Sequence, residues 1–363
     1  MKWPVHGSNP QYLYEAMEIT MPDTKVDFSA NINPLGPPPL LKKNWHQLMD
    51  VVSDYPDPKG DLLKQKLAER EGIHKNQILI GNGGSELISL LGRMLAGKNV
   101  LIVQPAFSEY EEVCRMNGCE IDYHQLESNS WEWDDDGFLA KLQKADVLFF
   151  CNPSNPTGIF YSKTRVLHLI KECERTNCLF IMDEAFYDFL LNYESIVPYI
   201  EKNPHLIILR SMTKMFAIPG LRLGYIMAHP LIIEQLSTLQ PHWSINALAL
   251  KAGEWCLESG TYINETRELI QTERERLFAF YKEWHFEVSP SKINFYLLKD
   301  LSLKDQLPLF QFLIEGGIIP RHTMNFPGLE GEWLRFAVKG PDANDQLMEA
   351  LMEWRKNNRL SSL

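Results

Sequence analysis

Arg210-Ser-Met-Thr-Lys-Met-Phe-Ala-Ile-Pro-Gly-Leu-Arg-Leu-Gly-Tyr225 connects two apolar runs of the chain. His205-Leu-Ile-Ile-Leu209 precedes this stretch, and Leu223-Gly-Tyr-Ile-Met-Ala228 overlaps its end. Short apolar runs bounded by turn residues are typical of buried strands, and the Pro-Gly pair at 219–220 forces a turn between them. The stretch therefore predicts two buried strands joined by a polar loop. That loop carries the hydroxyl and cationic side chains Ser211, Thr213, Lys214 and Arg222.

Lys214 is the chemically informative residue of the loop. A lysine between two buried strands has little water nearby, and desolvation favours the neutral amine. A neutral amine can attack an aldehyde and form a Schiff base. Arg222 presents a fork of donors suited to phosphate. Together with the hydroxyls of Ser211 and Thr213, this pattern indicates pyridoxal 5'-phosphate, which needs one group for its aldehyde and several for its phosphate. Taken alone, Lys214 would better fit a lysine on an ordinary surface loop, and its combination with Ser211 and Arg222 reverses that preference.

Apolar runs and helical stretches alternate through the part of the chain that precedes this loop. The expected strands cover residues 78–80, 100–103, 147–150 and 179–182, and the expected helices cover 61–72, 81–95, 107–117 and 163–175. Such alternation predicts an α/β fold with a mainly parallel sheet and helices on both faces.

The two ends of the chain follow a different pattern. Asn33-Pro-Leu-Gly-Pro-Pro-Pro39 cannot form a regular helix or a central strand, so the beginning of the chain is expected to be an arm. Beyond about residue 245 come two long helical stretches, then short strands and helices that indicate a smaller α+β domain. We expect the arm at 1–40 to join this small domain at 260–363, and a large cofactor-binding domain at 41–259.

Several polar residues follow the expected strands, where ligands bind in open parallel sheets. Gly84 and Ser85 open a helix whose amides could hold a phosphate, although a glycine turn chosen for backbone freedom explains them too. Asp183 should be buried and needs a partner, such as a pyridinium nitrogen or the next segment that it caps. Asn155, between two Asn-Pro steps, could donate to the cofactor's phenolic oxygen or only shape a rigid turn.

The remaining candidates are an aromatic ring and three basic side chains. Phe107 could stack on a planar ring, although a lone aromatic residue is more often part of a core. Arg321 and Arg335 are suited to carboxylate or phosphate, but either could be an ordinary solvated residue. His6 lies in the arm, where a lone histidine is more often incidental than functional.

Composition narrows the class of protein. The 363-residue chain has a formal net charge of -11, which argues against nucleic-acid binding and against an anionic membrane surface. No apolar run reaches the roughly 18 residues of a membrane span, and the first residues lack the apolar core of a signal peptide. The six cysteines form no Cys-x-x-Cys pair, so we expect reduced thiols, a cytoplasmic location and no metal site.

The motifs together resemble the class I/II aminotransferases of fold-type I. The matching motifs are Gly81-Asn-Gly-Gly-Ser-Glu86, Asn152-Pro-Ser-Asn-Pro-Thr-Gly158, Asp183-Glu-Ala185, and Ser211-Met-Thr-Lys214 with Arg222. The resemblance implies a mainly parallel seven-stranded sheet and a pyridoxal-phosphate enzyme. It implies that Lys214 forms the Schiff base, Asp183 pairs with the pyridine nitrogen, Asn155 contacts the phenolic oxygen and Phe107 stacks on the ring. It assigns the cofactor phosphate to Gly84, Ser85, Ser211 and Arg222, with Tyr55 reaching it from the second subunit of a homodimer.

Within that superfamily the chain is similar to histidinol-phosphate aminotransferases and to L-threonine-O-3-phosphate decarboxylases. His6-Gly7, Asp27-Phe-Ser-Ala-Asn-Ile-Asn-Pro-Leu-Gly36 and Arg321-His-Thr-Met-Asn-Phe-Pro-Gly-Leu329 resemble the decarboxylases. The resemblance implies decarboxylation of L-threonine O-3-phosphate to aminopropanol phosphate in cobalamin biosynthesis, with histidinol-phosphate transamination as the alternative. The residues expected to bind substrate are His6, Asn33, Asn155, Arg321 and Arg335. Phe186 departs from the tyrosine of many aminotransferases, and Tyr187 would point elsewhere if the segment stays extended.

Overall fold

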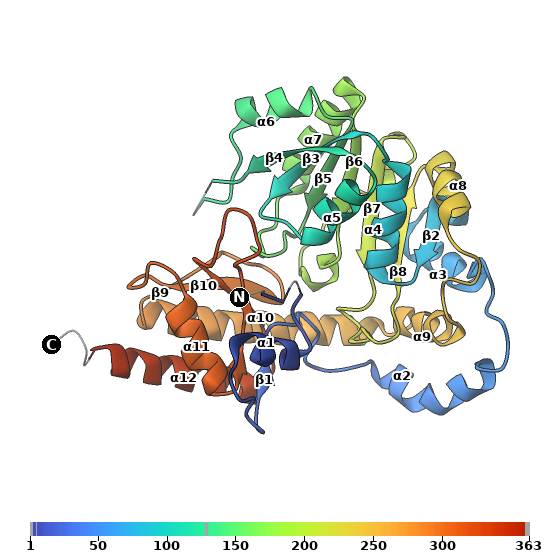
Figure 1. Ribbon diagram of the computed structural model, residues 1–363. Coiled ribbons are helices and arrows are strands. Elements are labelled where there is room, and N and C mark those ends of the chain that lie inside the picture. Colours follow the sequence, from blue (N-terminus) through green and yellow to red (C-terminus); the bar gives the residue numbers. More distant parts are fainter. Residues whose placement is uncertain (1–2, 5, 128–129, 360–363) are drawn as a thin grey trace.

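A mixed sheet forms the centre of the larger part of the molecule (Figure 1). The computed structural model describes residues 3–4, 6–127 and 130–359. Within those residues the sheet has seven strands, in the order β2 (Ile78–Gly81), β8 (Gly224–Ala228), β7 (Leu206–Ser211), β6 (Leu179–Asp183), β5 (Val147–Cys151), β3 (Asn99–Gln104) and β4 (Glu120–Gln125). Every neighbouring pair from β7 to β4 is parallel, whereas β8 runs antiparallel to both β7 and β2. The predicted α/β fold with a mainly parallel seven-stranded sheet is confirmed.

Alternate residues of each strand enter two separate hydrophobic cores, because successive strand side chains point to opposite faces. Val147, Phe149 and Ile181 belong to one core, which is completed by helices α4 (Gly83–Met94), α5 (Ser108–Met116) and α8 (Pro230–Leu239). Leu148 and Phe180 belong to the other core. Helices α3 (Asp61–Glu71), α6 (Asp135–Leu142), α7 (Lys163–Thr176) and α9 (Ala247–Leu257) contribute to that second core. The continuous apolar runs of the sequence therefore reflect strands that are buried on both faces.

A smaller antiparallel sheet lies in the C-terminal part of the chain. Its strand order is β12 (Arg321–His322), β13 (Leu334–Ala337), β10 (Phe295–Asp300) and β9 (Phe286–Val288). The helices around it are α10 (Gly260–Glu283), α11 (Leu307–Glu315) and α12 (Pro341–Arg359). Figure 1 shows α10 running beneath the large sheet. This part has the α+β composition expected from the sequence.

The N-terminal segment packs on the C-terminal part. Strand β1 (Val26–Asp27) pairs in parallel with β11 (Ile318–Ile319), and Tyr14 of α1 (Pro10–Met17) donates a hydrogen bond to the Ile314 carbonyl at 2.6 Å. Helix α2 (Pro39–Asn44) then leads away toward α9 (Figure 1). The sequence did not reveal α1, because its eight residues begin at a proline within an otherwise aperiodic stretch. The boundaries placed at residues 40 and 259 stay predictions.

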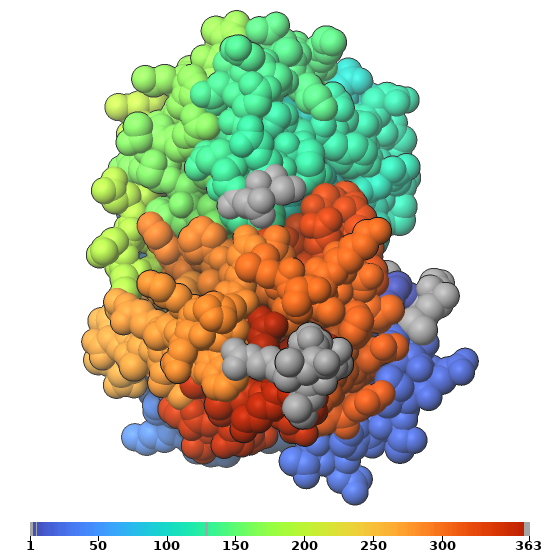
Figure 2. Space-filling model, turned by 90° about the vertical axis from the view of Figure 1, so that its left-hand side faces the viewer, coloured from blue at the N-terminus to red at the C-terminus, as the bar shows by residue number. Residues whose placement is uncertain are grey.

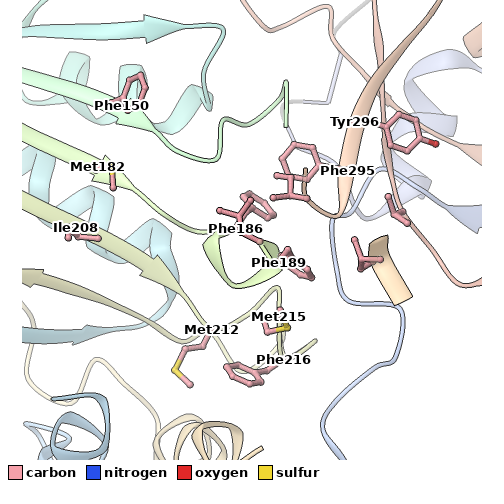
Figure 3. Packing of buried hydrophobic residues seen from close by; sticks show 14 of the residues in the cluster. Phe150, Met182, Phe186, Phe189, Ile208, Met212, Met215, Phe216, Phe295 and Tyr296 are labelled. Carbon is pink, nitrogen blue, oxygen red and sulfur yellow. The ribbon is translucent and has the colours of Figure 1, made fainter. Parts of the chain in front are cut away.

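The core beneath the large sheet continues into the C-terminal part without interruption. Phe150, Met182 and Ile208 belong to the same cluster of buried residues as Phe295 and Tyr296 of β10. Figure 3 shows Phe186 and Phe189 lying between these two groups, and the rings of Phe186 and Phe295 are 4.8 Å apart. In Figure 2 the green atoms of the sheet-bearing part lie directly against the orange atoms of the C-terminal part. Across the described chain, no helix is long and apolar enough to cross a membrane.

Candidate active site

One pocket, of about 270 Å³, lies where the parallel strands end and the C-terminal part meets them. Loops after β5, β6 and β7 supply part of its wall, as the strand-end rule for open parallel sheets predicts. The structure brings twelve of the predicted site residues to this pocket: His6, Gly84, Ser85, Phe107, Asn155, Asp183, Ser211, Thr213, Lys214, Arg222, Arg321 and Arg335.

Lys214 follows β7 and projects into the pocket. Burial, together with the positive charges of Arg335 and Arg222, lowers the pKa of its amine to about 8. The loop that carries it is held from behind, because the Asn33 N–H donates to the Lys214 carbonyl at 3.1 Å. The Asn33 side chain also donates to the Met215 carbonyl at 2.8 Å. The amine on this fixed loop is therefore half neutral near pH 8, far below the pH at which an ordinary lysine loses its proton, and a neutral amine is what a carbonyl-attacking nucleophile requires.

A cradle of donors lies beside the lysine at the N-terminus of α4. Gly83 adopts φ +79°, and a Cβ there would approach Arg222 Nη2 to 2.6 Å, so only glycine leaves the guanidinium in place. The hydroxyls of Ser211 and Thr213 are 2.8 Å apart on the facing loop. Backbone amides at a helix N-terminus, two hydroxyls and a guanidinium form a donor set that suits a phosphate group.

Asp183 ends β6 and is buried at the base of the pocket. Its Oδ2 accepts a hydrogen bond from the Tyr110 hydroxyl at 2.5 Å, and its Oδ1 accepts one from the Ala185 N–H at 2.8 Å. Burial raises the pKa of this carboxyl, while both hydrogen bonds act in the opposite direction. Sequence reasoning missed Tyr110. Its position three residues after Phe107, on the same face of a helix, was the available signal.

Two buried arginines occupy the side of the pocket formed by the C-terminal part. Arg335 donates to Asn155 Oδ1 at 2.5 Å and to the Ser29 carbonyl at 2.9 Å, and burial together with Arg321 lowers its pKa to about 9. Burial lowers the pKa of Arg321 to about 10. Both guanidiniums are thus charged at neutral pH. The two groups that accept hydrogen bonds from Arg335, the Asn155 amide oxygen and the Ser29 carbonyl, are uncharged.

His6 brings the N-terminal arm to the same pocket. Its ring lies 5.7 Å from the Phe107 ring, and its Nε2 is 3.8 Å from Glu109 Oε1. Glu109 also accepts a hydrogen bond from the Ser85 hydroxyl at 3.2 Å. The arm, the helix N-terminus of α5 and the phosphate cradle therefore converge at the mouth of the pocket. Glu109, the second residue of α5, was not singled out from the sequence.

Two predicted site residues are not in the pocket of this chain. Tyr55 is 84% exposed and its ring lies 5.1 Å from that of Trp243. Asn33 is buried behind the Lys214 loop. Its side-chain amide donates to the Met215 carbonyl, as described above, and to the Thr266 hydroxyl at 2.7 Å. Asn31, from the same arm motif, lines the pocket, and its buried Oδ1 has no hydrogen-bond partner among the described residues. The substrate role of Asn33 and the cofactor role of Tyr55 stay predictions.

Phe186 lines the pocket and Tyr187 does not. The Tyr187 hydroxyl instead accepts a hydrogen bond from Arg70 at 2.8 Å. Tyr187 was expected to point away because of an extended backbone, but the segment forms a 3-10 turn at Tyr187–Phe189. Its direction is set by a buried polar cluster, in which the Arg210 guanidinium lies 3.7 Å above the Tyr187 ring.

The pocket fits pyridoxal 5'-phosphate. The cradle around Gly83 suits its phosphate, the depressed pKa of Lys214 suits its aldehyde, and the Asp183 carboxylate suits a pyridinium nitrogen. Phe107 lies at the pocket wall, immediately before the helix that carries Tyr110, the tyrosine that donates to Asp183. Each part of the cofactor thus has a group of matching chemistry.

Comparison with known proteins gives the family of the chain. The model of the family "aminotransferase class I and II" matches residues 23–351. A threonine-phosphate decarboxylase of Salmonella typhimurium is 34% identical over 349 residues, which cover 95% of both chains. A histidinol-phosphate aminotransferase of Thermoanaerobacter pseudethanolicus is also 34% identical, over 91% of this chain and 93% of that protein. The crystal structure of L-threonine-O-3-phosphate decarboxylase from Porphyromonas gingivalis superposes with a TM-score of 0.81 at 26% identity, covering 91% of this chain and 99% of that one. With Lys214, Asp183 and the phosphate cradle in one pocket, and a family model that matches most of its length, this chain belongs to the class I and II aminotransferase family.

Proposed function

We propose that this protein is a pyridoxal-phosphate-dependent lyase that decarboxylates L-threonine O-3-phosphate to aminopropanol phosphate, a step of cobalamin biosynthesis. As a class I and II family member it uses pyridoxal 5'-phosphate. The relatives named threonine-phosphate decarboxylase support the choice of reaction, and a further relative is a bifunctional adenosylcobalamin biosynthesis protein of Leptospira interrogans, 33% identical over 357 residues.

The observation that carries the proposal is the excess of cations on the substrate side of the pocket. Arg321 and Arg335 are both buried there, and His6 approaches from the arm. Two buried guanidiniums are costly unless anions neutralise them. Phosphothreonine carries a carboxylate and a phosphate, whereas histidinol phosphate carries only a phosphate. The site therefore matches a substrate with two anionic groups.

The residues of the pocket divide the work of the reaction. When bound, the cofactor supplies a sink for the electrons released at the substrate α-carbon. Asp183 supplies the negative charge that would pair with the ring nitrogen of the cofactor. Lys214 is the amine that can hold or deliver a proton at the substrate α-carbon. Arg335 would hold the substrate carboxylate and Arg321 the phosphate, and these two contacts would fix the orientation of the substrate α-carbon in the pocket. The bond between the α-carbon and the carboxyl carbon breaks, carbon dioxide leaves, and one proton takes its place.

Histidinol-phosphate transamination is the second candidate. Relatives of that name match the chain as extensively as the decarboxylases do. Phe186 weighs against it, because this side chain offers the pocket no hydroxyl for the cofactor's phenolic oxygen. The two reactions differ in which bond at the substrate α-carbon is broken.

Measurement of carbon dioxide release separates the two candidates. The purified protein should release carbon dioxide from L-threonine O-3-phosphate, with or without a 2-oxo acid, and should use unphosphorylated threonine poorly. Arg321→Ala should raise the KM for phosphothreonine by about tenfold or more, because one charge-assisted hydrogen-bond donor is lost. Efficient conversion of histidinol phosphate with 2-oxoglutarate, without carbon dioxide from phosphothreonine, would overturn the proposal in favour of transamination.

We also propose a cytoplasmic homodimer with a shared site. The arm packs on the C-terminal part, and exposed apolar side chains, among them Trp45, Met49, Val52 and Tyr55, follow it on the surface. The site of this chain receives no contact from its own Tyr55. A second copy would bring that residue to the phosphate cradle, as the family resemblance implies.

A further inference from the structure

A buried ion pair lies directly behind the pocket, between the ends of β6 and β7. Glu184 follows the last residue of β6, and Arg210 is the penultimate residue of β7. Arg210 Nε donates to Glu184 Oε2 at 2.8 Å, and the two side chains are 1% and 0% exposed. Neither side chain lines the pocket, and neither has a part in the proposed reaction.

Further contacts fix both partners of this pair. Glu71, the last residue of α3, places its Oε2 2.5 Å from Arg210 Nη1. The Tyr193 hydroxyl donates to Glu184 Oε1 at 2.5 Å and accepts a hydrogen bond from Arg210 Nη2 at 3.2 Å. The donors of the guanidinium are therefore used in three directions, which leaves the pair little freedom to move.

The chain neighbours of the pair belong to the candidate active site. Asp183 precedes Glu184, Ser211 follows Arg210, and both neighbours line the pocket. Successive side chains of an extended chain point to opposite sides, so the ion pair behind the pocket and the groups inside it share two short stretches of backbone. Asp183 suits the ring nitrogen of the cofactor and Ser211 suits its phosphate. The separation of these two groups depends on how the ends of β6 and β7 are held together.

The pairing of β6 with β7 stops at this point. Asp183 and Leu209 are the last partners of the ladder, and the Glu184 N–H adds one more bond, to the Leu209 carbonyl at 2.8 Å. The next N–H, that of Ala185, donates to Asp183 Oδ1 at 2.8 Å and lowers the pKa of that carboxyl. The direction of the peptide after Glu184 thus decides one of the hydrogen bonds that orient Asp183.

Stability alone does not account for a buried ion pair at this position. Well-packed apolar side chains that fill the same space are often equally stabilising, because they need no desolvation of charge. Apolar contacts have no preferred direction, whereas a guanidinium binds its acceptors in a fixed fork. The ion pair therefore provides direction at the place where the sheet no longer does.

We propose that the Glu184–Arg210 pair positions the cofactor site, by holding the ends of β6 and β7 at the separation that the cofactor requires. Asp183 and Ser211 are the two groups that it directs. The proposal rests on the cofactor site of the proposed function and not on the choice between decarboxylation and transamination. It requires an acceptor in the place of Glu184, and not its negative charge as such. A glutamine side chain offers such an acceptor, and a methionine of similar length does not.

The ionisation of Asp183 in the cofactor-free protein is the first test. Infrared difference spectra against Asp183→Asn measure it. Glu184→Met should raise the pKa of the Asp183 carboxyl, because the Ala185 N–H bond that lowers this pKa is weakened. Glu184→Gln should leave the pKa unchanged.

Arg355→Met is the matched control for this test. Arg355 also pairs with a buried carboxylate, that of Asp300 at 2.7 Å, but neither residue lines the pocket. The control should lower the temperature of thermal unfolding without moving the Asp183 signal. An unmoved signal in Glu184→Met, or an equal movement in the control, would overturn the proposal.

Binding of the whole cofactor, compared with that of its phosphate part, is the second test. Glu184→Met should weaken the binding of pyridoxal 5'-phosphate by about tenfold, and Glu184→Gln should stay within about threefold of the wild type. Inorganic phosphate, measured by competition against the cofactor, touches only the Ser211 end and should stay within about threefold in both variants. Equal losses for phosphate and cofactor would mean that the cradle itself has collapsed, and would refute a role in setting the separation.

A milder variant covers the case in which Glu184→Met does not fold. Tyr193→Phe removes only the hydroxyl that donates to Glu184, and it should move the Asp183 signal and the cofactor affinity in the same directions, the latter by about threefold. Wild-type values for both in Tyr193→Phe would then overturn the proposal. If the wild type binds no pyridoxal 5'-phosphate, the proposed function fails, and the infrared comparison in cofactor-free protein still decides the role of the pair.

Discussion

Lys214 combines burial with a balance of charge that favours its neutral form. Arg335 and Arg222 lower the pKa of the amine, while Glu109 and Asp183 raise it by smaller amounts. The sequence suggested that Lys214 is buried, because two apolar runs flank its loop. It did not suggest the effect of the charged neighbours, because several of them come from elements far away in the chain. The pKa near 8 therefore depends on the assembled pocket as well as on the local sequence.

Attachment of the cofactor should follow the titration of Lys214. A pKa lowered to about 8 means that the amine is half neutral at that pH and fully neutral above it. The rate at which cofactor-free protein binds pyridoxal 5'-phosphate covalently should therefore rise from pH 6 through a midpoint near pH 8 and level off about one pH unit above it, whereas an ordinary lysine titrates near 10.4. Stopped-flow absorbance measures this rate. Arg335→Met should move the midpoint upward, and a wild-type midpoint near 10 would contradict the assignment.

Tyr110 gives Asp183 a second fixed donor. Tyr110→Phe should raise the pKa of the Asp183 carboxyl further, because burial already raises it and the hydroxyl opposes that shift. Infrared difference spectra against Asp183→Asn would measure the change in cofactor-free protein. The Kd for the cofactor should rise by roughly tenfold, as loss of a hydrogen bond to a charged group allows.

Tyr161→Phe provides the control for Tyr110. It removes another buried phenol hydrogen bond, to the Trp131 carbonyl, at a position outside the pocket. This variant should lose some stability and keep its cofactor affinity. Equal cofactor affinity in Tyr110→Phe and wild type would show that Asp183 does not depend on the tyrosine.

At the scale of single elements, the start of α4 illustrates what a short motif can and cannot reveal. Gly83 and its neighbours suggested a phosphate-binding helix N-terminus, and the structure adds the reason for the glycine, which is its close approach to Arg222. The two residues are far apart in sequence but meet because β8 pairs with β2. A single sequence contains no information on that pairing.

Gly83→Ala tests whether the close approach matters. The substitution places a methyl group 2.6 Å from Arg222 Nη2 at a φ of +79°, so it should displace the guanidinium and weaken cofactor binding by tenfold or more, roughly. Gly97→Ala is the matched control, because Gly97 has a φ of +74° and nothing within 4 Å of an added Cβ. Both variants should lose about 1 kcal/mol of stability in thermal unfolding, from the backbone alone. If both retain full cofactor affinity, the contact with Arg222 has no role in binding.

The whole molecule shows where sequence reasoning succeeded and where it failed. The central strands were predictable because they are continuous apolar runs, buried on both faces. Edge strand β4 was missed because Glu120-Ile-Asp-Tyr-His-Gln125 is not a continuous apolar run. Most of its side chains are polar and at least partly accessible to solvent. Most cofactor candidates reached the pocket because they follow strand ends. The substrate candidate Asn33 did not reach it, because its side chain is buried behind the Lys214 loop, whereas Asn31 lines the pocket. The choice between two asparagines of one irregular arm depends on backbone directions that no periodicity encodes.

The proposed dimer makes a prediction about mixed subunits. Tyr55→Ala and Lys214→Ala should each be inactive or nearly so as homodimers. A mixed dimer contains one site with both wild-type residues if Tyr55 serves the opposite subunit, so mixing should restore partial carbon dioxide release. Native mass spectrometry would verify subunit exchange. No recovery after verified exchange would mean that each chain completes its own site.

The pairing of β1 with β11 has a consequence for how the protein is made. Val26 and Ile318 are partners, although roughly 290 residues separate them in the chain. At a synthesis rate of about 5–20 residues per second, the arm leaves the ribosome on the order of 15 to 60 s before its partner strand exists. During that time β1 has no partner strand, and the strands of the large sheet, the last of which ends at Ala228, are completed before β11 is made. The binding site is thus completed late in synthesis, when a segment made early, β1, pairs with one made about 290 residues later, β11.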